Sequence, residues 1–170
     1  MERKGMVTMK GNPVVLVGIE IKVGDKAPDF EVTANDLSPV KFSSISKDKV
    51  SIITVVPSID TGVCDKMTRK FNEEAAALGK DVTVLAISMD LPFAQARWCG
   101  AAGIENLQTL SDYRLASFGN AYGMLIKDLR LLARGIFVVD KQGIVRYVQL
   151  VPEITEEPNY KEAIEAAKKL

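Results

Sequence analysis

The 170-residue sequence contains no histidine and only two cysteines, Cys64 and Cys99. Without histidine, the chain can build neither a Cys-His nor a Ser-His nucleophile pair, which excludes the usual protease and hydrolase arrangements. Histidine-ligated metal sites are excluded as well, and two cysteines are too few for a four-thiolate zinc site. We therefore expect neither a metal nor a cofactor. Any group that activates a cysteine here must be a helix end, a cation or a hydroxyl.

An excess of charge of either sign is also absent. The chain has 22 Lys and Arg against 22 Asp and Glu, so it has no general attraction to nucleic acid or to an anionic membrane. No apolar run reaches the length of a membrane span, and the N-terminus has no apolar signal core. We therefore expect a cytoplasmic protein with no nucleic-acid or membrane partner. The length fits a single domain over residues 1–170.

Two apolar runs, residues 50–56 and 82–88, predict central strands buried on both faces of a sheet. Each run is followed by a helical pattern. The first predicted helix ends at Gly79, and the second begins at Pro92 and stops at Gly103. Alternation of strands and helices favours parallel strands joined by right-handed crossovers.

Two predicted hairpins flank this unit. Residues 6–18 predict two short strands around a Gly-Asn-Pro turn, and residues 136–140 and 144–150 predict a second hairpin. A short helix is expected at 116–122, and a last amphipathic helix begins near Tyr160. The fold class is therefore α/β, a thioredoxin-like sheet flanked by helices, with an N-terminal β-hairpin extension at about residues 6–18.

Cys64 follows the first central strand and precedes its helix, in the run Pro57-Ser58-Ile59-Asp60-Thr61-Gly62-Val63-Cys64. Ligands of open α/β sheets bind at such strand ends. The first turn of a helix carries a positive partial charge and free N–H groups, which favour a thiolate. Cys64 is therefore a candidate nucleophile. A less basic thiolate is also a weaker nucleophile, so a fast site must stabilise its transition state with fixed donors as well.

Three residues are candidates for that support. Thr61 lies one turn before Cys64 and its hydroxyl can both accept and donate, although a helix N-cap explains it equally well. Arg134, just before the strand predicted at 136–140, carries a permanent charge and a planar fork of donors. An arginine at a strand end is also commonly solvated or salt-bridged. Pro57 fixes the exit from the strand and shields the thiolate on one side, or is simply a turn residue.

The run from Pro57 to Cys64, taken with Arg134, resembles the Pro, Thr, Cys and Arg of the peroxiredoxin active site. Residues 90–104 resemble the resolving-cysteine segment of the bacterial thiol peroxidases, the atypical two-cysteine branch of that family. Trp98 and Gly135 depart from the pattern, which has Phe and Ala at these positions. Further segments that look like family blocks are 109–112, 121–123 and 131–134.

This resemblance implies a thiol-specific peroxidase that reduces hydrogen peroxide and organic hydroperoxides. Cys64 would be the peroxidatic nucleophile and become a sulfenic acid, and Cys99 would resolve it as an intrachain Cys64–Cys99 disulfide. Thioredoxin would then reduce the disulfide. The family likeness also implies Thr61, Arg134 and Pro57 as catalytic residues, and a homodimer. Because two separate helices can hold the cysteines too far apart for a disulfide, we expect local unfolding, with residues 100–103 as the place to yield.

Other interpretations of the two cysteines stay open. The main alternative is a redox-regulated binding or sensor protein that uses the same pair as a switch. Cys99 could also be a buried core thiol. A thioredoxin-type oxidoreductase fits less well, because the cysteines lie 35 positions apart and form no C-x-x-C motif. A glutathione-dependent peroxidase would need a basic cluster near Cys64, where only Lys66 and Arg69 stand.

Overall fold

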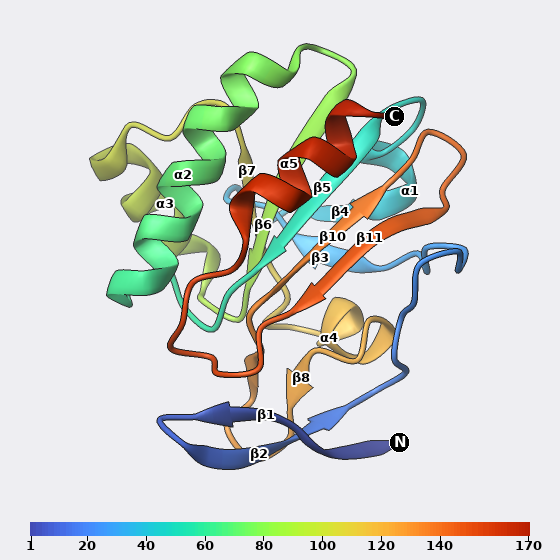
Figure 1. Ribbon diagram of the computed structural model, residues 1–170. Coiled ribbons are helices and arrows are strands. Elements are labelled where there is room, and N and C mark those ends of the chain that lie inside the picture. The colour runs from blue at the N-terminus through green and yellow to red at the C-terminus, as the bar shows by residue number, and fades with distance from the viewer.

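A seven-stranded sheet forms the centre of the structure, a computed structural model that describes residues 1–170 (Figure 1). Three neighbouring strands run parallel, and strands at both sides of them are antiparallel, which confirms the expected thioredoxin-like α/β sheet. None of the helices combines the length and apolarity needed to cross a bilayer. In sheet order the strands are β11 (Val145–Leu150), β10 (Gly135–Val139), β5 (Val50–Val55), β6 (Val82–Ser88), β7 (Gln108–Ser111), β3 (Glu31–Thr33) and β4 (Pro39–Lys41).

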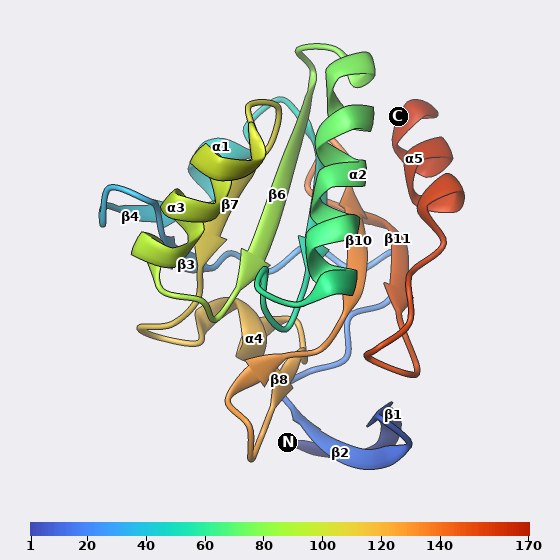
Figure 2. The ribbon, with the colours of Figure 1, turned by 90° about the vertical axis from the view of Figure 1, so that its left-hand side faces the viewer.

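Both faces of the central sheet are covered, and every residue of its central strand β5 is buried. Successive side chains of a strand point to opposite faces, and Ile52 and Ile53 of β5 accordingly belong to two separate buried clusters. Figure 2 shows α2 (Gly62–Leu78) and α5 (Tyr160–Lys168) together on one side of the sheet. The cluster on the opposite face, to which Ile53 belongs, includes Phe42 of α1 (Phe42–Ile45) and Phe118 of α4 (Ser117–Ala121).

The two helices after β5 and β6 begin and end where the sequence predicts. Thr61 caps the start of α2, and Gly79, with φ of 84°, follows its last residue. The next helix, α3 (Pro92–Ala102), has Pro92 in its first turn and ends at Gly103 in the left-handed conformation, with φ of 65° and ψ of 39°. Both stops use glycine at a positive φ, which other residues rarely adopt.

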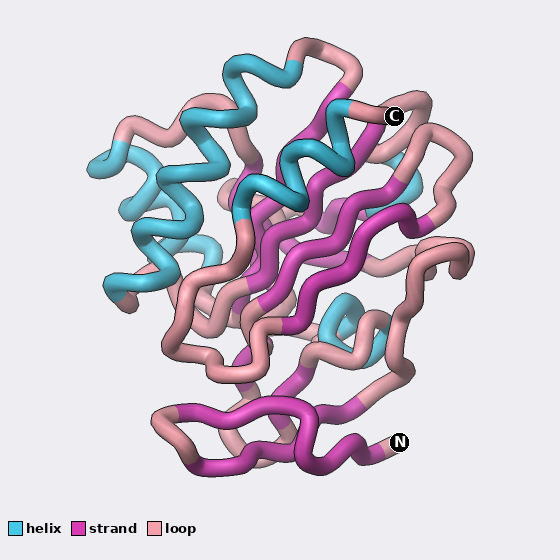
Figure 3. Tube along the Cα trace, in the orientation of Figure 1, coloured by secondary structure: helices cyan, strands magenta, loops and turns pink.

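The N-terminal hairpin forms a second, smaller sheet below the main one (Figure 3). Its strands are β1 (Glu2–Met9) and β2 (Asn12–Val17), so it starts four residues earlier than the expected Met6. The first residues of β1, Glu2 to Lys4, are charged and show no alternation of apolar residues, so the sequence did not indicate a strand there. The pairing register also shifts between Arg3 and Val7, around Gly5 with its φ of 71°. Two strands that the sequence analysis missed complete this sheet, β8 (Leu125–Ile126) and β9 (Leu131–Leu132).

A buried carboxylate, Asp112, stabilises the start of α4. The side chain is only 1% exposed and accepts hydrogen bonds from the N–H groups of Phe118 at 3.1 Å and Gly119 at 2.8 Å. Burial is the largest influence and raises the pKa of Asp112 from 3.8 to about 6. Folding therefore favours the protonated form of this group.

This shift predicts a pH-dependent stability. Because the folded pKa lies above the unfolded one, the native state binds the proton more tightly, and the free energy of unfolding falls as pH rises from about 4 to about 6. Asp112→Asn removes this contribution. Over that window we expect wild type to lose on the order of 1–3 kcal/mol relative to Asp112→Asn. Urea unfolding of both proteins at several pH values measures the difference, and a pH-independent difference would contradict the prediction.

Candidate active site

Cys64 lies in the first turn of α2, immediately beyond the C-terminal end of β5. Its side chain is fully buried, with 0% exposure, and its thiol forms no disulfide. The sulfur therefore sits at the positive end of a helix of 17 residues, away from bulk water. A low local dielectric strengthens every electrostatic contact that the sulfur makes.

Arg134 makes the strongest of those contacts. It is 2% exposed, and its Nη2 donates to Cys64 Sγ at 3.0 Å. Its Nε donates to the carbonyl oxygen of Ile154 at 2.8 Å, and Nη1 points to Met67 Sδ at 3.6 Å. No carboxylate lies within 4.0 Å of the guanidinium. The buried guanidinium is therefore held by the Ile154 carbonyl and the two sulfur atoms, and the negatively charged Glu157 interacts with it only at longer range.

The pairing of strands explains how Arg134 reaches this place. Gly135 pairs with Val55 across the antiparallel β10 and β5, so Arg134 sits beside the residue that follows β5. Gly135 stands where the resemblance led us to expect Ala. A Cβ at Gly135 would come within 2.7 Å of the Gln149 carbonyl oxygen and 2.8 Å of the Met124 Cε, so glycine allows the close approach next to Arg134.

Thr61 and Pro57 lie in the same segment as Cys64. The Thr61 hydroxyl accepts a hydrogen bond from the Cys64 N–H at 3.4 Å and donates to the Ser58 carbonyl at 3.1 Å. Thr61 thus acts as the N-cap of α2, the alternative that the sequence left open, and its hydroxyl is bonded to the backbone of Cys64. Pro57 is buried between β5 and α2.

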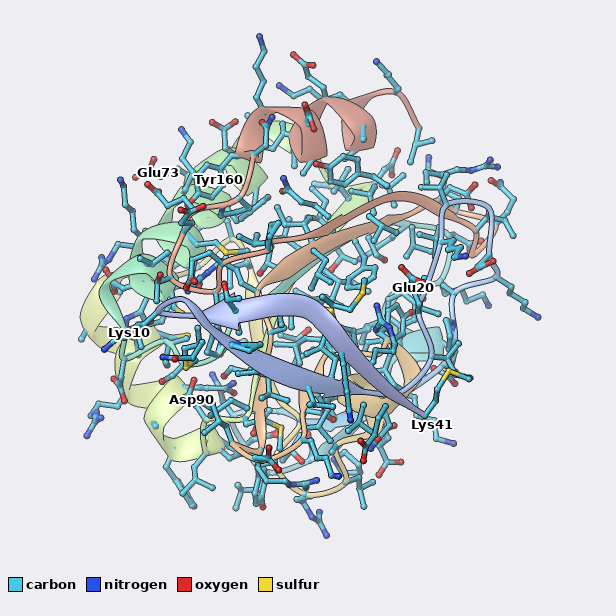
Figure 4. All side chains as sticks on the ribbon, turned by 60° about the horizontal axis from the view of Figure 1, so that its bottom comes forward. Lys10, Glu20, Lys41, Glu73, Asp90 and Tyr160 are labelled. Atoms are coloured by element: carbon cyan, nitrogen blue, oxygen red, sulfur yellow. The ribbon has the colours of Figure 1, made fainter.

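Asp90 holds the loop that leads to Cys64. Its carboxylate accepts hydrogen bonds from Ser58 Oγ at 2.6 Å, from the Ile59 N–H at 2.9 Å and from Ser88 Oγ at 2.6 Å. Asp90, labelled in Figure 4, lies just before α3, so one carboxylate connects the segments before the two cysteine-bearing helices. The sequence analysis did not identify this residue as part of the site.

Cys99 lies apart from this group, in the last turns of α3. The side chain is partly exposed, and its Sγ is 3.2 Å from Thr109 Oγ1 on the neighbouring β7. Both cysteines are free thiols on different helices. The structure therefore brings Thr61, Cys64 and Arg134 together, with Pro57 buried in the loop between β5 and α2, and it leaves Cys99 bonded elsewhere.

Comparison with known proteins places this arrangement in a family. The sequence matches the family described as Redoxin over residues 22–164. It is 61% identical over 164 residues to the thiol peroxidase of Bacillus subtilis (strain 168), with 96% of this chain and 97% of that protein covered. The identity to the thiol peroxidase of Halalkalibacterium halodurans is 62% over 162 residues, with 95% and 96% covered.

The chain belongs to the Redoxin family. Relatives this similar over nearly their whole length also confirm the expected class of activity: the chain is a thiol-dependent peroxidase, and so an oxidoreductase. Among solved structures, a peroxiredoxin-like protein from Aquifex aeolicus matches with a TM-score of 0.90 at 48% identity, over 98% of both chains. A thiol peroxidase from Chromobacterium violaceum has a TM-score of 0.85 at 18% identity, covering 96% of this chain and 95% of that one, and supports the fold alone.

In this redoxin a small polar cluster joins the two cysteine-bearing helices. The Asp65 carboxylate, next to Cys64, accepts a 2.7 Å hydrogen bond from Trp98 Nε1, next to Cys99, and a 2.9 Å bond from Arg69 Nε. The Arg69 guanidinium also lies 5.6 Å from the Trp98 ring centroid. Partial burial acts to raise the pKa of Asp65, but the bonds from Arg69 and Trp98 hold it below its ordinary value.

The Trp98 interaction gives a physical reason for one departure from the family pattern. Phenylalanine has no N–H to donate, so the bond to Asp65 depends on tryptophan at this position. Sequence analysis missed Asp65 as a partner of Trp98. The spacing of Asp65 and Arg69, four residues apart on one helix, is a signal for their ion pair that the sequence analysis did not use, whereas the indole donor comes from another helix and leaves no such local signal.

Beside this cluster is an open cavity of about 530 Å³ with charged walls. Glu157 bridges it by accepting from Lys66 Nζ at 3.0 Å and from Tyr160 Oη at 2.9 Å, and the Lys66 and Tyr160 bonds lower the pKa of Glu157. Tyr160 is labelled in Figure 4. The cavity lies between the part of α2 just after Cys64 and the start of α5. Its lining residues are Asp65, Lys66, Arg69, Lys70, Glu73, Glu157 and Tyr160.

Trp98→Phe tests the connection between the helices. The change keeps an aromatic ring but removes the donor, so we expect a loss of about 1 kcal/mol in the free energy of unfolding. We also expect faster amide exchange over residues 99–104, the end of α3, because one of its ties to α2 is gone. Chemical unfolding and hydrogen exchange by mass spectrometry measure both effects. Arg97→Lys, a change at an exposed neighbour without such a bond, is the control, and equal exchange in the two variants would contradict the prediction.

Proposed function

We propose that Cys64 is the peroxidatic nucleophile of this thiol-dependent peroxidase, and that Arg134 is its principal activator. The contact between Arg134 Nη2 and Cys64 Sγ, in a place where the guanidinium has no carboxylate partner, carries this proposal. It agrees with a sulfur at the N-terminus of α2. Both features favour the thiolate, which is the reactive form.

In the first step the Cys64 thiolate attacks one oxygen of a hydroperoxide. A sulfur–oxygen bond forms, the O–O bond breaks, and the departing oxygen takes a proton and leaves as water or an alcohol. Negative charge develops on that leaving oxygen, so donors that already point into the site stabilise the transition state. Arg134 carries five N–H donors in a planar fork and can address both the sulfur and the peroxide oxygens. Thr61 and Pro57 hold the loop and the helix start in place.

In the second step the Cys99 thiol condenses with the Cys64 sulfenic acid. A disulfide forms and water leaves, so the two cysteines are together oxidised by two electrons. Because Cys64 is fully buried and Cys99 is bonded to Thr109 on another part of the sheet, at least one segment must unfold locally first. The end of α3, Gly100 to Gly103, consists only of glycine and alanine, so few side-chain contacts hold it in place, and we expect it to unfold first.

A thioredoxin-type dithiol completes the cycle by reducing the disulfide through thiol–disulfide exchange. The decisive experiment is a coupled assay with thioredoxin, thioredoxin reductase and NADPH, supplied with either hydrogen peroxide or an organic hydroperoxide. We expect sustained NADPH oxidation with both peroxides. Oxidation of the protein without turnover would instead support a redox-regulated binding or sensor protein.

Several finer properties belong to the same proposal. The whole chain, residues 1–170, would work as one domain in the cytoplasm, without metal or cofactor and without a nucleic-acid or membrane partner. A homodimer is expected, and the large apolar side chains of Leu91 and Phe93, which are 53% and 67% exposed at the start of α3, support an interface there. Sedimentation equilibrium of the reduced protein tests the oligomer.

Arg134→Lys keeps the charge but removes the planar fork of donors. We expect the peroxide step to slow by roughly 10²–10³-fold, the usual effect of losing one preorganised donor. Reduction of the preformed disulfide by thioredoxin should change far less, because Arg134 acts on the peroxide step. Stopped-flow oxidation measures the first rate and a single-turnover thioredoxin assay the second. Wild-type peroxide kinetics would remove Arg134 from its role.

Cys99→Ser separates the two chemical steps. Cys64 and its activators are untouched, so each chain should still reduce one peroxide. The sulfenic acid then lacks its partner, so turnover with thioredoxin should stop and sulfinic acid should accumulate under excess peroxide. Mass spectrometry of the oxidised wild type should show the loss of two hydrogens and an intrachain Cys64–Cys99 link. An interchain disulfide, or full turnover by Cys99→Ser, would contradict the two-cysteine mechanism.

A further inference from the structure

The N-terminal hairpin lies outside residues 22–164, the range that matches the Redoxin family, yet it is bonded to the loop beside Arg134. This loop runs from β11 to α5, and Figure 1 shows it reaching down to the hairpin. Thr8 of β1 pairs with Glu153 in a parallel bridge, with backbone bonds from the Thr8 N–H to the Pro152 carbonyl at 2.7 Å and from the Ile154 N–H to the Thr8 carbonyl at 2.9 Å.

Glu153 strengthens this junction with its side chain. From the hairpin, the carboxylate accepts hydrogen bonds from Thr8 Oγ1 at 2.7 Å and from the backbone N–H groups of Lys10 at 2.9 Å and Gly11 at 3.0 Å. From its own loop it accepts from Thr155 Oγ1 at 2.7 Å and the Thr155 N–H at 3.1 Å. Five donors on one carboxylate fix the loop against the hairpin turn, which Lys10 marks in Figure 4.

The residue after Glu153 connects this junction to the site. The Ile154 carbonyl accepts the 2.8 Å hydrogen bond from Arg134 Nε, and the Arg134 carbonyl accepts from the Val151 N–H at 3.0 Å. Glu153 lies between these two partners. Val151 therefore holds the backbone of Arg134, and Ile154 holds its side chain. The bond to Ile154 also fixes the plane of the guanidinium, because Nε lies in that plane together with the Nη2 that contacts Cys64 Sγ.

We propose that the N-terminal hairpin is a working part of the peroxidatic site: through Glu153 it fixes the Ile154 carbonyl that orients Arg134 toward Cys64. Glu153 is thus a positioning residue, which acts through Arg134 and touches no reacting atom. The proposal rests on the role of Arg134 proposed above. It assigns a catalytic purpose to a hairpin that would otherwise only cover one end of the sheet.

Two variants break this junction without touching Arg134 or Cys64. Glu153→Gln replaces one acceptor oxygen with an NH₂ group, which faces N–H and O–H donors, so several of the five bonds are lost. Thr8→Val removes only the hairpin hydroxyl and changes no charge. Glu156→Gln is the matched control, because it removes the same charge three residues away, from an exposed side chain that makes no hydrogen bond or ion pair. All three should be made in a Cys99→Ser background, so that only Cys64 reacts.

The measurements are the stopped-flow rate of Cys64 oxidation by hydrogen peroxide and the pH profile of Cys64 alkylation by iodoacetamide. We expect Glu153→Gln to slow the peroxide step by about 10-fold, because a loosened guanidinium is misplaced for part of the time. The alkylation profile should move to higher pH, since the thiolate loses a fixed cation. Thr8→Val should shift both quantities in the same direction but less, and Glu156→Gln should match its parent protein.

A merely structural hairpin would lower the melting temperature of the variants and leave the alkylation profile in place. That result, in folded Glu153→Gln and Thr8→Val, would overturn the proposal. Arg134→Lys in the same background separates this failure from that of the proposed function: a slow Arg134→Lys beside normal Glu153 and Thr8 variants rejects only the hairpin's role. Normal kinetics in Arg134→Lys would reject the role of Arg134 itself.

Discussion

The contact between the Arg134 guanidinium and the Cys64 sulfur is the interaction on which the site depends. Both side chains are almost completely buried, and no carboxylate neutralises the cation. In the proposed mechanism this buried cation lies where it can stabilise negative charge that develops at the sulfur and at the peroxide oxygens. Under the proposed role of Arg134, the contact that activates the thiol is also one of the contacts that hold the buried guanidinium in place. In the proposed cycle, oxidation of Cys64 replaces the thiol that Arg134 contacts, and so weakens the contact that holds the closed arrangement together.

The sheet supplies the geometry for this contact. Cys64 comes from the helix after β5, and Arg134 from the residue before β10, two positions 70 residues apart in the chain. The antiparallel register of β5 and β10 brings them to the same end of the sheet, where helix α2 also presents its N-terminus. Backbone groups then fix the guanidinium from the far side, through the carbonyl of Ile154. The site is thus assembled from rigid elements, with loops held by Asp90 and Glu153.

The two cysteines place opposite demands on the same helices. In the proposed cycle, the peroxide step needs Cys64 held against Arg134, and the disulfide step needs Cys64 and Cys99 to come together from separate helices. The Asp65–Trp98 bond joins these helices one residue away from each cysteine, so it holds the closed arrangement without occupying either sulfur. Short, solvated bonds of this kind can open locally at a free-energy cost far below that of global unfolding.

Much of the fold could be predicted because its signals are local. Buried strands at 50–56 and 82–88, the stops at Gly79 and Gly103, and Pro92 in the first turn of α3 follow from residue types alone. The same holds for Cys64 at a helix N-terminus. Two-residue strands such as β8 and β9 leave no periodic pattern, so these two strands of the second sheet were missed, and the charged residues at the start of β1 gave no apolar alternation that would show the early start of the hairpin at Glu2.

The site divides in the same way between sequence and tertiary structure. The motif from Pro57 to Cys64 and the presence of Arg134 are visible in the sequence, and the family resemblance that they carry indicated the class of activity. Only the tertiary structure decided that Arg134 lacks a carboxylate partner and contacts the sulfur, since strand register sets both. The Ile154 carbonyl that orients it is a backbone group, present in every residue and therefore without any signal in the sequence.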